Sequence, residues 1–144
     1  MQKLTCILLV DDDEITNSLH SMLLEDMEVA EQVKMVTSAD EALKHVRENL
    51  NEKAESGKPC LMFLDINMPG VSGFEMLQQL QSDDMWPAEH LHVYILSSSG
   101  NQRDLDQAEQ LQVDGYLIKP LTRQKIEQVV KEVYNAGPDL IAPK

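Results

Sequence analysis

CLMFLDINMPG, residues 60 to 70, is the stretch of sequence that decides the fold. Its apolar run leads directly into one carboxylate, Asp65, and turn-forming residues follow at once. A short apolar run bounded by turn signals predicts a strand that is buried on both faces, as in a parallel sheet. Open α/β sheets bind ligands beyond the carboxyl ends of such strands, so Asp65 lies where chemistry is expected. Taken alone, Asp65 fits the cap of a following helix equally well.

Apolar runs and helix signals alternate along the rest of the chain. Strands are predicted at residues 4–10, 33–37, 60–65, 91–96 and 115–118. Helices are predicted at 15–27, from the capping box Ser38–Glu41, at 73–81, around Leu105–Leu111, and from Thr122 to Gly137. Strict alternation predicts one α/β domain, a doubly wound parallel (βα)5 sheet with helices on both faces. The polar segments 49–59 and 82–90 then lie at the opposite end of the sheet from Asp65.

The first predicted helix carries its apolar residues at helical spacing. They are Ile15, Leu19, Met22, Leu23 and Met27. Residues three, four and seven positions apart share one face of a helix, so these side chains form a stripe.

The composition is that of an ordinary soluble protein, because 42% of the 144 residues are apolar and 26% are charged. A formal net charge of −13 repels phosphates, and no basic stripe offsets it, so neither direct DNA binding nor membrane association is expected. The N-terminus lacks a signal peptide, and no apolar run approaches the roughly 20 residues of a membrane span, which predicts a cytoplasmic protein. Cys6 and Cys60 begin apolar runs and are interpreted as reduced core residues, with a disulfide as the alternative.

Polar side chains follow four of the predicted strands at the point where each strand ends. They are Asp11, Asp12 and Asp13, then Asp65 and Asn67, then Ser97 and Ser98, and finally Lys119. The carboxyl ends of parallel strands meet at one edge of a sheet, so we expect these groups to gather there. Clustered carboxylates repel, so either one carboxyl has a raised pKa or the site binds a cation; oxygen ligands favour magnesium before calcium. A carboxylate nucleophile, a magnesium ion and a lysine are together the equipment for receiving a phosphoryl group.

Each of these residues also has an ordinary interpretation. The acidic run suits a helix N-terminus, Lys119 suits a solvated loop, and residues 97–99 suit a turn. These interpretations do not explain why four strand ends carry, in chain order, acids, an acid, a hydroxyl and a lysine.

Four motifs carry a family resemblance. They are VDDDE at 10–14, LDINMPGVSG at 64–73, ILSSSG at 95–100 and YLIKP at 116–120. In this order they resemble the receiver domain of two-component response regulators, and the resemblance covers residues 4 to about 135. It implies a flavodoxin-like fold with strand order 2-1-3-4-5, a receiver domain at residues 1–137, and a short tail at 138–144.

The resemblance also implies roles for the site residues. Asp65 is the expected phosphoacceptor, and Lys119 and Ser97 are the other expected catalytic residues. The expected ligands of Mg²⁺ are Asp11, Asp12, Asp65 and the backbone carbonyl of Asn67. Ser97 and Tyr116 are the expected switch pair, and the Lys119–Pro120 peptide bond is expected to be cis.

By the same resemblance, the expected function is that of a response regulator in a phosphorelay. A sensor histidine kinase or a histidine phosphotransfer protein supplies the phosphoryl group, and a downstream protein target receives the signal. The chain resembles stand-alone receivers, and no turnover is expected beyond self-phosphorylation from a donor and autodephosphorylation. A homodimer through the fourth helix, fifth strand and fifth helix is left open.

The departures from the family pattern are mild. Serine replaces the commoner threonine at position 97, Ser98 stands where a smaller residue is usual, and the spacing from Asp12 to Asp65 is long. Asp13 is interpreted as surface charge. His20, His45, His90 and His92 are interpreted as ordinary surface or core-edge residues away from the site.

Two other functions remain as alternatives. A phosphatase of the haloacid dehalogenase type places its nucleophile in the first acidic run, but its Asp-x-Asp-x-Thr motif finds Ile15 where threonine is required. A pseudo-receiver that binds partners without phosphorylation typically lacks an acid or the lysine, and neither is missing here. Flavodoxin-like nucleotide binding is disfavoured because the acidic first loop repels phosphate.

Overall fold

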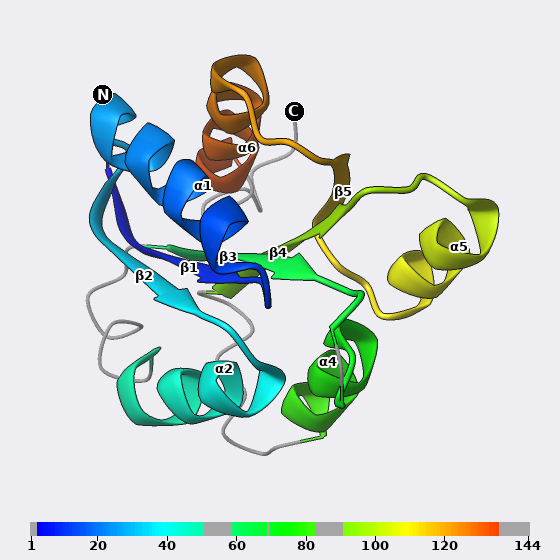
Figure 1. Ribbon diagram of the computed structural model, residues 1–144. Coiled ribbons are helices and arrows are strands. Elements are labelled where there is room, and N and C mark those ends of the chain that lie inside the picture. Colours follow the sequence, from blue (N-terminus) through cyan, green and yellow to red (C-terminus); the bar gives the residue numbers. More distant parts are fainter. Residues whose placement is uncertain (1–2, 51–58, 69, 83–90, 136–144) are drawn as a thin grey trace.

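The computed structural model describes residues 3–50, 59–68, 70–82 and 91–135. Its strands are β1 (Leu4–Val10), β2 (Ala30–Val36), β3 (Cys60–Asp65), β4 (Leu91–Ser97) and β5 (Gly115–Ile118). Its helices are α1 (Glu14–Met27), α2 (Ala39–His45) with the π-helical turn η1 (Val46–Leu50), α4 (Gly73–Gln81), α5 (Gln102–Gln110) and α6 (Arg123–Asn135). All strand pairs are parallel, in the order β2-β1-β3-β4-β5 (Figure 1). The predicted flavodoxin-like α/β sheet is confirmed.

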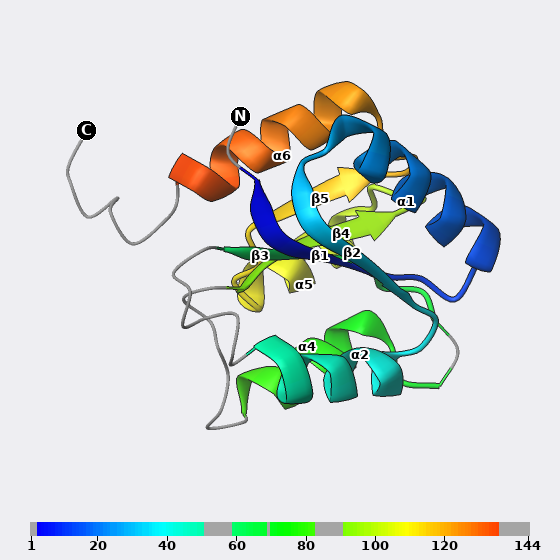
Figure 2. The ribbon, with the colours of Figure 1, turned by 90° about the vertical axis from the view of Figure 1, so that its left-hand side faces the viewer.

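Helices cover both faces of this sheet. Helices α1 and α6 lie on one face, and α2 and α4 lie on the other (Figure 2). Each face has its own apolar core, because successive side chains of a strand point to opposite faces. Leu8, Met62 and Leu64 contribute to the α2/α4 side, whereas Leu9 and Phe63 contribute to the α1/α6 side.

The three central strands are buried along their whole length, which is why their sequences read as continuous apolar runs. Their predicted positions are confirmed, and β4 extends one residue further, to Ser97. Cys6 and Cys60 face each other across β1 and β3 as buried thiols without a disulfide, and the thiol of Cys6 donates to the sulfur of Cys60 at 2.9 Å. The prediction that both cysteines are core residues is confirmed, and their reduced state stays a prediction.

The edge strand β2 begins at Ala30, three residues before its predicted start. Glu28 ends α1 in the left-handed conformation, at φ 53°, and the chain then turns directly into pairing with β1. Polar residues occupy much of this strand because β2 is an edge strand of the described sheet and most of its side chains are exposed or only partly buried, so the apolar pattern understates its length. The helix after β2 also continues through η1 to Leu50, which corrects the predicted start of the 49–59 loop.

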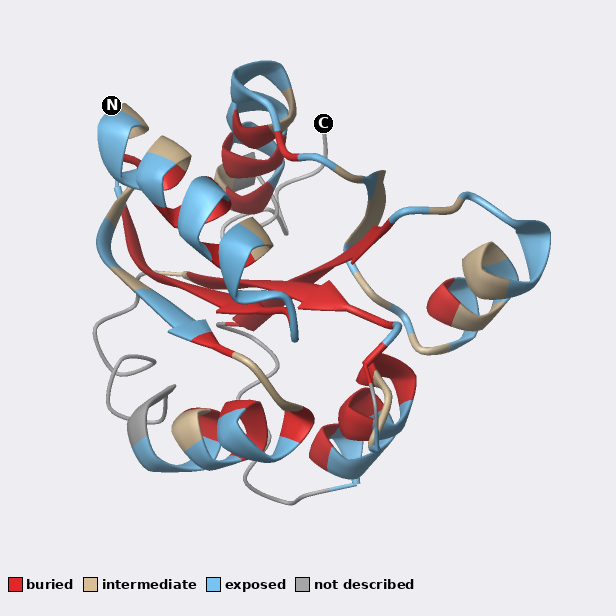
Figure 3. Cartoon of the chain, in the orientation of Figure 1, coloured by how far each residue is buried: buried red, intermediate tan, exposed pale blue. Residues whose placement is uncertain are grey.

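Helix α1 presents its apolar stripe to solvent rather than to the core. Ile15 is 73% exposed, Leu19 60% and Met22 65%, while Leu23 and Met27 are only partly buried. The buried face instead carries Asn17, His20, Ser21 and Leu24. Figure 3 shows the exposed surface of α1 facing away from the sheet. Three polar residues thus occupy the inner face of a helix that packs on the sheet.

Two other predictions lie mainly outside the described residues. They are the loops at 49–59 and 82–90, and the boundary between the domain at 1–137 and the tail at 138–144. Within the ranges that the structure describes, no helix is long and apolar enough to cross a membrane.

Candidate functional site

The first acidic group lies where β1 ends and α1 begins. Asp11 is 3% exposed, and its Oδ1 accepts the backbone N–H of Asp13 at 2.9 Å. Asp12 is exposed. Asp13 is the N-cap of α1, where its Oδ1 accepts the N–H groups of Ile15 and Thr16, at 3.0 and 3.3 Å. A hydrogen bond with the Thr16 side chain lowers the pKa of Asp13 most, and the bonds from the N–H groups of Thr16 and Ile15 lower it further. Asp13 is therefore a surface residue, as predicted, and its role as the N-cap explains why an aspartate stands at this position.

Asp65 ends β3 and is 4% exposed. Its Oδ1 accepts the backbone N–H of Asn67 at 3.0 Å. The loop that follows depends on two glycines. Gly70 has φ +80°, in the region that favours glycine, and a Cβ added to Gly73 would lie 2.6 Å from the backbone oxygen of Asp65. The glycines of the LDINMPGVSG motif thus let α4 begin directly against the end of β3.

Lys119 follows β5 and reaches across to both acidic groups. Its Nζ lies 2.8 Å from Oδ2 of Asp11 and 3.5 Å from Oδ2 of Asp65. Its backbone N–H donates to the carbonyl oxygen of Ser97 at 2.8 Å, which joins the turn to the end of β4. The Lys119–Pro120 bond is cis, as predicted. The strand ends therefore bring Asp11, Asp65 and Lys119 together.

Burial and charge shift the ionisation of this group. Burial raises the pKa of Asp65 to about 6, while the Asn67 N–H and Lys119 oppose the shift and the charges of Asp11 and Asp12 add to it. Burial alone would lower the pKa of Lys119, but its hydrogen bond to Asp11 and the charges of Asp65 and Asp11 raise it overall. The lysine stays an ammonium, whereas burial first, and then the charges of its two acidic neighbours, make the ionisation of Asp65 costly.

Three carboxylates form a set that can hold a metal ion. One oxygen each from Asp11, Asp12 and Asp65 lie within 4.8 Å of one another. Oδ2 of Asp11 is buried and pairs with the Lys119 ammonium at 2.8 Å. An all-oxygen set with one exposed member suits a small hard cation that keeps some of its water, so these residues fit Mg²⁺. The carbonyl of Asn67 remains a predicted further ligand.

Ser97 and Tyr116 lie on neighbouring strands beside this group. Ser97 is fully buried, and its Oγ accepts the N–H of Ser99 at 3.1 Å. The hydroxyl of Tyr116, a partly buried residue, donates to the carbonyl oxygen of Ser99 at 2.7 Å. Ser99 therefore links the two side chains: its N–H donates to the Ser97 hydroxyl, and its carbonyl oxygen accepts from the Tyr116 hydroxyl.

His20 is a residue that the sequence interpretation missed. The sequence predicts an ordinary residue away from the site. In the structure His20 is buried, at 5% exposed, and its Nε2 accepts the backbone N–H of Leu121, two residues after Lys119, at 3.3 Å. Its pKa is lowered, first by burial and then by Lys119, while Asp11 acts in the opposite direction. His92 is also buried, but it lies near the start of β4, beside Asp114. The polar inner face of α1 was the available signal for His20, and it was obscured by the apolar residues of the outer face.

Comparison with known proteins gives a consistent result. The family model of the response regulator receiver domain matches residues 7–131 of the chain. The probable methanogenesis regulatory protein FilR2 of Methanothrix harundinacea is 30% identical over 131 residues, which cover 88% of this chain and 79% of that protein. The chemotaxis protein CheY of Halobacterium salinarum is 27% identical, with 90% of this chain and 97% of that protein covered.

Solved structures agree with this. The crystal structure of a two component response regulator from Cytophaga hutchinsonii superposes with a TM-score of 0.81 at 32% identity, covering 93% of this chain and 99% of that one. The family model matches most of the chain, and the matched range includes the strand ends described above. The chain belongs to the response regulator receiver domain family.

Proposed function

We propose that this chain is the phosphoacceptor of a two-component phosphorelay, and that Asp65 takes the phosphoryl group. One observation carries the proposal: the buried Asp65 lies 3.5 Å from the Lys119 ammonium and within reach of Asp11 and Asp12. An anionic nucleophile is here placed among groups that can neutralise a phosphoryl group. Incubation with acetyl phosphate and Mg²⁺, followed by intact mass spectrometry, tests it through the gain of one phosphoryl group.

The chemical step follows from these positions. An oxygen of the Asp65 carboxylate bonds to phosphorus while the bond from phosphorus to the imidazole nitrogen of a donor phosphohistidine breaks. The departing nitrogen keeps the electron pair and takes a proton from solvent. Lys119 offsets negative charge on the transferring oxygens. Mg²⁺, held by Asp11, Asp12, Asp65 and the Asn67 carbonyl, would supply further charge neutralisation when bound.

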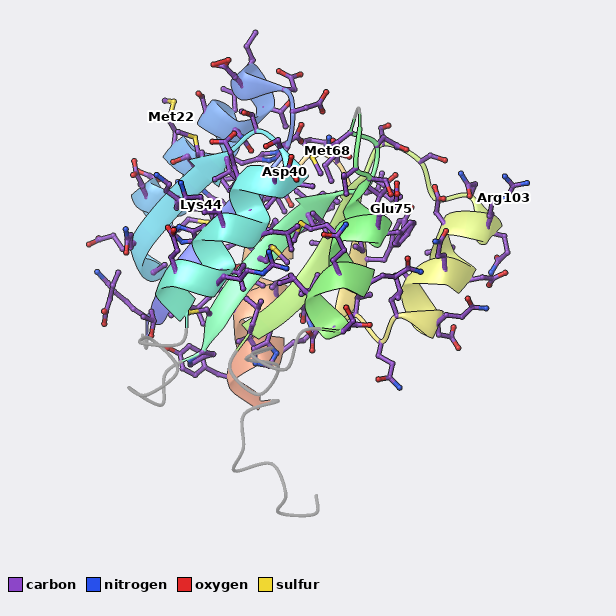
Figure 4. The ribbon with its side chains drawn as sticks, turned by 90° about the horizontal axis from the view of Figure 1, so that it is seen from below. Met22, Asp40, Lys44, Met68, Glu75 and Arg103 are labelled. Atoms are coloured by element: carbon purple, nitrogen blue, oxygen red, sulfur yellow. The ribbon has the colours of Figure 1, made fainter. Side chains whose placement is uncertain are left out.

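The outer face of α1 is the surface that we assign to the phosphodonor protein. Ile15, Leu19 and Met22 are exposed at helical spacing, and α1 begins at the rim of the site, where Asp13 caps it. Met22 projects away from the body of the molecule in Figure 4. A donor must cover this rim to bring a phosphohistidine to Asp65, so an apolar stripe beside the rim suits a helical donor surface.

The opposite face of the molecule is less suited to the same partner. Exposed polar and charged side chains cover α2, α4 and α5 there, among them Asp40, Lys44, Glu75 and Arg103 (Figure 4). Mixed charge of this kind is typical of a solvated surface.

The switch pair fits signalling through protein contacts. An oxygen of the phosphoryl group on Asp65 would accept a hydrogen bond from the Ser97 hydroxyl, and Tyr116 would respond through residues 97–99. The surface of α5, β5 and α6 would then change for a downstream target or a second copy of the chain. Ile118, which is 40% exposed, lies on this surface. A cytoplasmic location is part of the proposal.

The two rival functions are less consistent with the site. A dehalogenase-type phosphatase requires its nucleophile in the first acidic run, where Asp13 is occupied as a helix cap and Asp11 is paired with Lys119. A pseudo-receiver does not need a lysine ammonium placed between two buried carboxylates. The gain of one phosphoryl group separates the proposed function from the pseudo-receiver. Peptide mapping of the label to Asp65, rather than to Asp11 or Asp13, separates it from the phosphatase.

A further inference from the structure

The buried face of α1 bonds to the backbone on both sides of the site. His20 accepts the N–H of Leu121 through Nε2 at 3.3 Å. Three residues earlier, the side-chain amide of Asn17 donates to the carbonyl oxygens of Asp11 and Val36, both at 3.0 Å. Residues three apart share a helix face, so one surface of α1 contacts the acidic end of β1 and the turn that carries the lysine.

The turn that carries Lys119 is held from three elements. Its Lys119 N–H donates to Ser97 of β4, at 2.8 Å. The ammonium of Lys125, on α6, donates to the carbonyl oxygens of Ile118 and Pro120, at 2.5 and 3.1 Å. His20 supplies the third attachment, from α1. Leu121 is 4% exposed, so an N–H left without His20 would be buried and unpaired, which is costly.

We propose that His20 is a positioning residue for Lys119, which it serves as a neutral imidazole that accepts the Leu121 N–H and fixes the lysine-bearing turn against α1. The inference rests on the proposed function, because positioning has a consequence only if Lys119 assists phosphoryl transfer. Acceptance through Nε2 requires that this nitrogen carry no proton, so the ring proton belongs on Nδ1. The lowered pKa of His20, which burial causes first, agrees with a neutral ring.

The alternative is that His20 merely fills the core. A volume-filling role predicts that an apolar side chain of similar size replaces it without affecting Lys119. A positioning role predicts that only an acceptor replaces it. His20→Gln supplies an amide oxygen that can accept the N–H, and His20→Leu supplies bulk without an acceptor.

His92→Leu is the matched control, because His92 is also buried, at 7% exposed, and lies near the opposite end of the sheet from Lys119. The test compares wild type with the three variants, all as the full chain. The first measurement is the rate of labelling by acetyl phosphate across a range of donor concentrations, with Mg²⁺ present.

We expect His20→Leu to lower the maximal labelling rate by about tenfold, with a smaller change in the half-saturating donor concentration, since small misplacements of a catalytic group are costly. His20→Gln should stay within about threefold of wild type, and His92→Leu should label at the wild-type rate even where it lowers stability. Wild-type labelling by His20→Leu would overturn the proposal. So would a loss in His20→Gln equal to that in His20→Leu.

NMR provides a readout that does not depend on labelling. Imidazole ¹⁵N shifts should place the proton of His20 on Nδ1, and the side-chain resonances of Lys119 should move in His20→Leu but not in His20→Gln or His92→Leu. A proton on Nε2, or Lys119 resonances unmoved in His20→Leu, would refute positioning. If wild type takes no label, the proposed function fails while these spectra still decide whether His20 positions Lys119. If His20→Leu does not fold, the wild-type tautomer and His20→Gln decide it.

Discussion

The ammonium nitrogen of Lys119 lies 3.5 Å from Oδ2 of Asp65, and the two side chains are only 22% and 5% exposed. The ion pair does not fully compensate the carboxylate, because burial and the charges of Asp11 and Asp12 still raise the pKa of Asp65 to about 6. The site therefore holds more negative charge than its own lysine neutralises. It is suited to a cation and to a phosphoryl group that shares the lysine.

Asp65→Asn should stabilise the metal-free protein at neutral pH. The pKa of Asp65 is 3.8 in ordinary surroundings and about 6 in the folded chain, so the folded state binds more protons between these values. Wild type consequently loses stability as pH rises from about 4 to about 6, by about 1–3 kcal/mol, and the asparagine variant does not. Urea unfolding at pH 4 and pH 7.5, without divalent cations, measures the difference. A gap between the two proteins that does not grow with pH would refute this.

Magnesium should raise the free energy of unfolding, because it relieves repulsion among Asp11, Asp12 and Asp65. A ligand that binds only the folded state contributes about 2.7 kcal/mol at a hundredfold excess over its dissociation constant. Asp12→Ala should remove most of this increment. Asp13→Ala is the control, since Asp13 caps α1 and lies outside the carboxylate cluster; it should lower stability but keep the increment. Thermal unfolding at several Mg²⁺ concentrations tests both, and a wild-type melting temperature indifferent to millimolar Mg²⁺ would count against the metal site.

Leu19→Asp should slow phosphoryl transfer from a histidine phosphotransfer protein by about tenfold or more, because it places a charge in an apolar contact. Labelling by acetyl phosphate, which needs no docking surface, should stay unchanged. Met35→Asp is the control: Met35 is also exposed, at 43%, but lies on the edge strand β2. Equal losses with both donors would mean that Leu19 serves the fold or the site rather than docking.

Ser97→Ala should still bind beryllofluoride, a phosphoryl mimic, but should transmit less of the change. The variant lacks the hydroxyl that would draw residues 97–99 toward the mimic, and Tyr116 is bonded to Ser99 in that segment. NMR shift changes around Tyr116 and along residues 103–112 should therefore be smaller than in wild type. If those changes keep their full wild-type size, the signal travels by another route and Ser97 is only a ligand of the site.

The sequence predicted most of this fold because the three central strands are apolar throughout, and each ends at a candidate site residue or directly before one. It predicted the site for the same reason, since parallel strands bring their carboxyl ends together and so place Asp11 and Asp65 near Lys119. The prediction was wrong about the start of β2, where the residues of a strand are polar and not buried.

Helix α1 was predicted at the correct place, but the sequence did not indicate which of its faces is buried. Asn17 and His20 are buried because the ends of β1 and β2 and the turn after β5 present backbone groups that need partners. Ile15 and Leu19 stay in solvent. Periodicity locates a stripe on a helix, but it does not reveal which face meets backbone that must be hydrogen-bonded.

The most direct test of the phosphoacceptor assignment is to locate the label. Wild-type protein would be phosphorylated with acetyl phosphate and Mg²⁺, reduced with borohydride, which converts an aspartyl phosphate to homoserine, and analysed by peptide mass spectrometry. We predict homoserine at position 65 alone, and no label in Asp65→Asn, which should remain folded. Homoserine at Asp11, Asp12 or Asp13, or undiminished labelling of Asp65→Asn, would contradict the assignment.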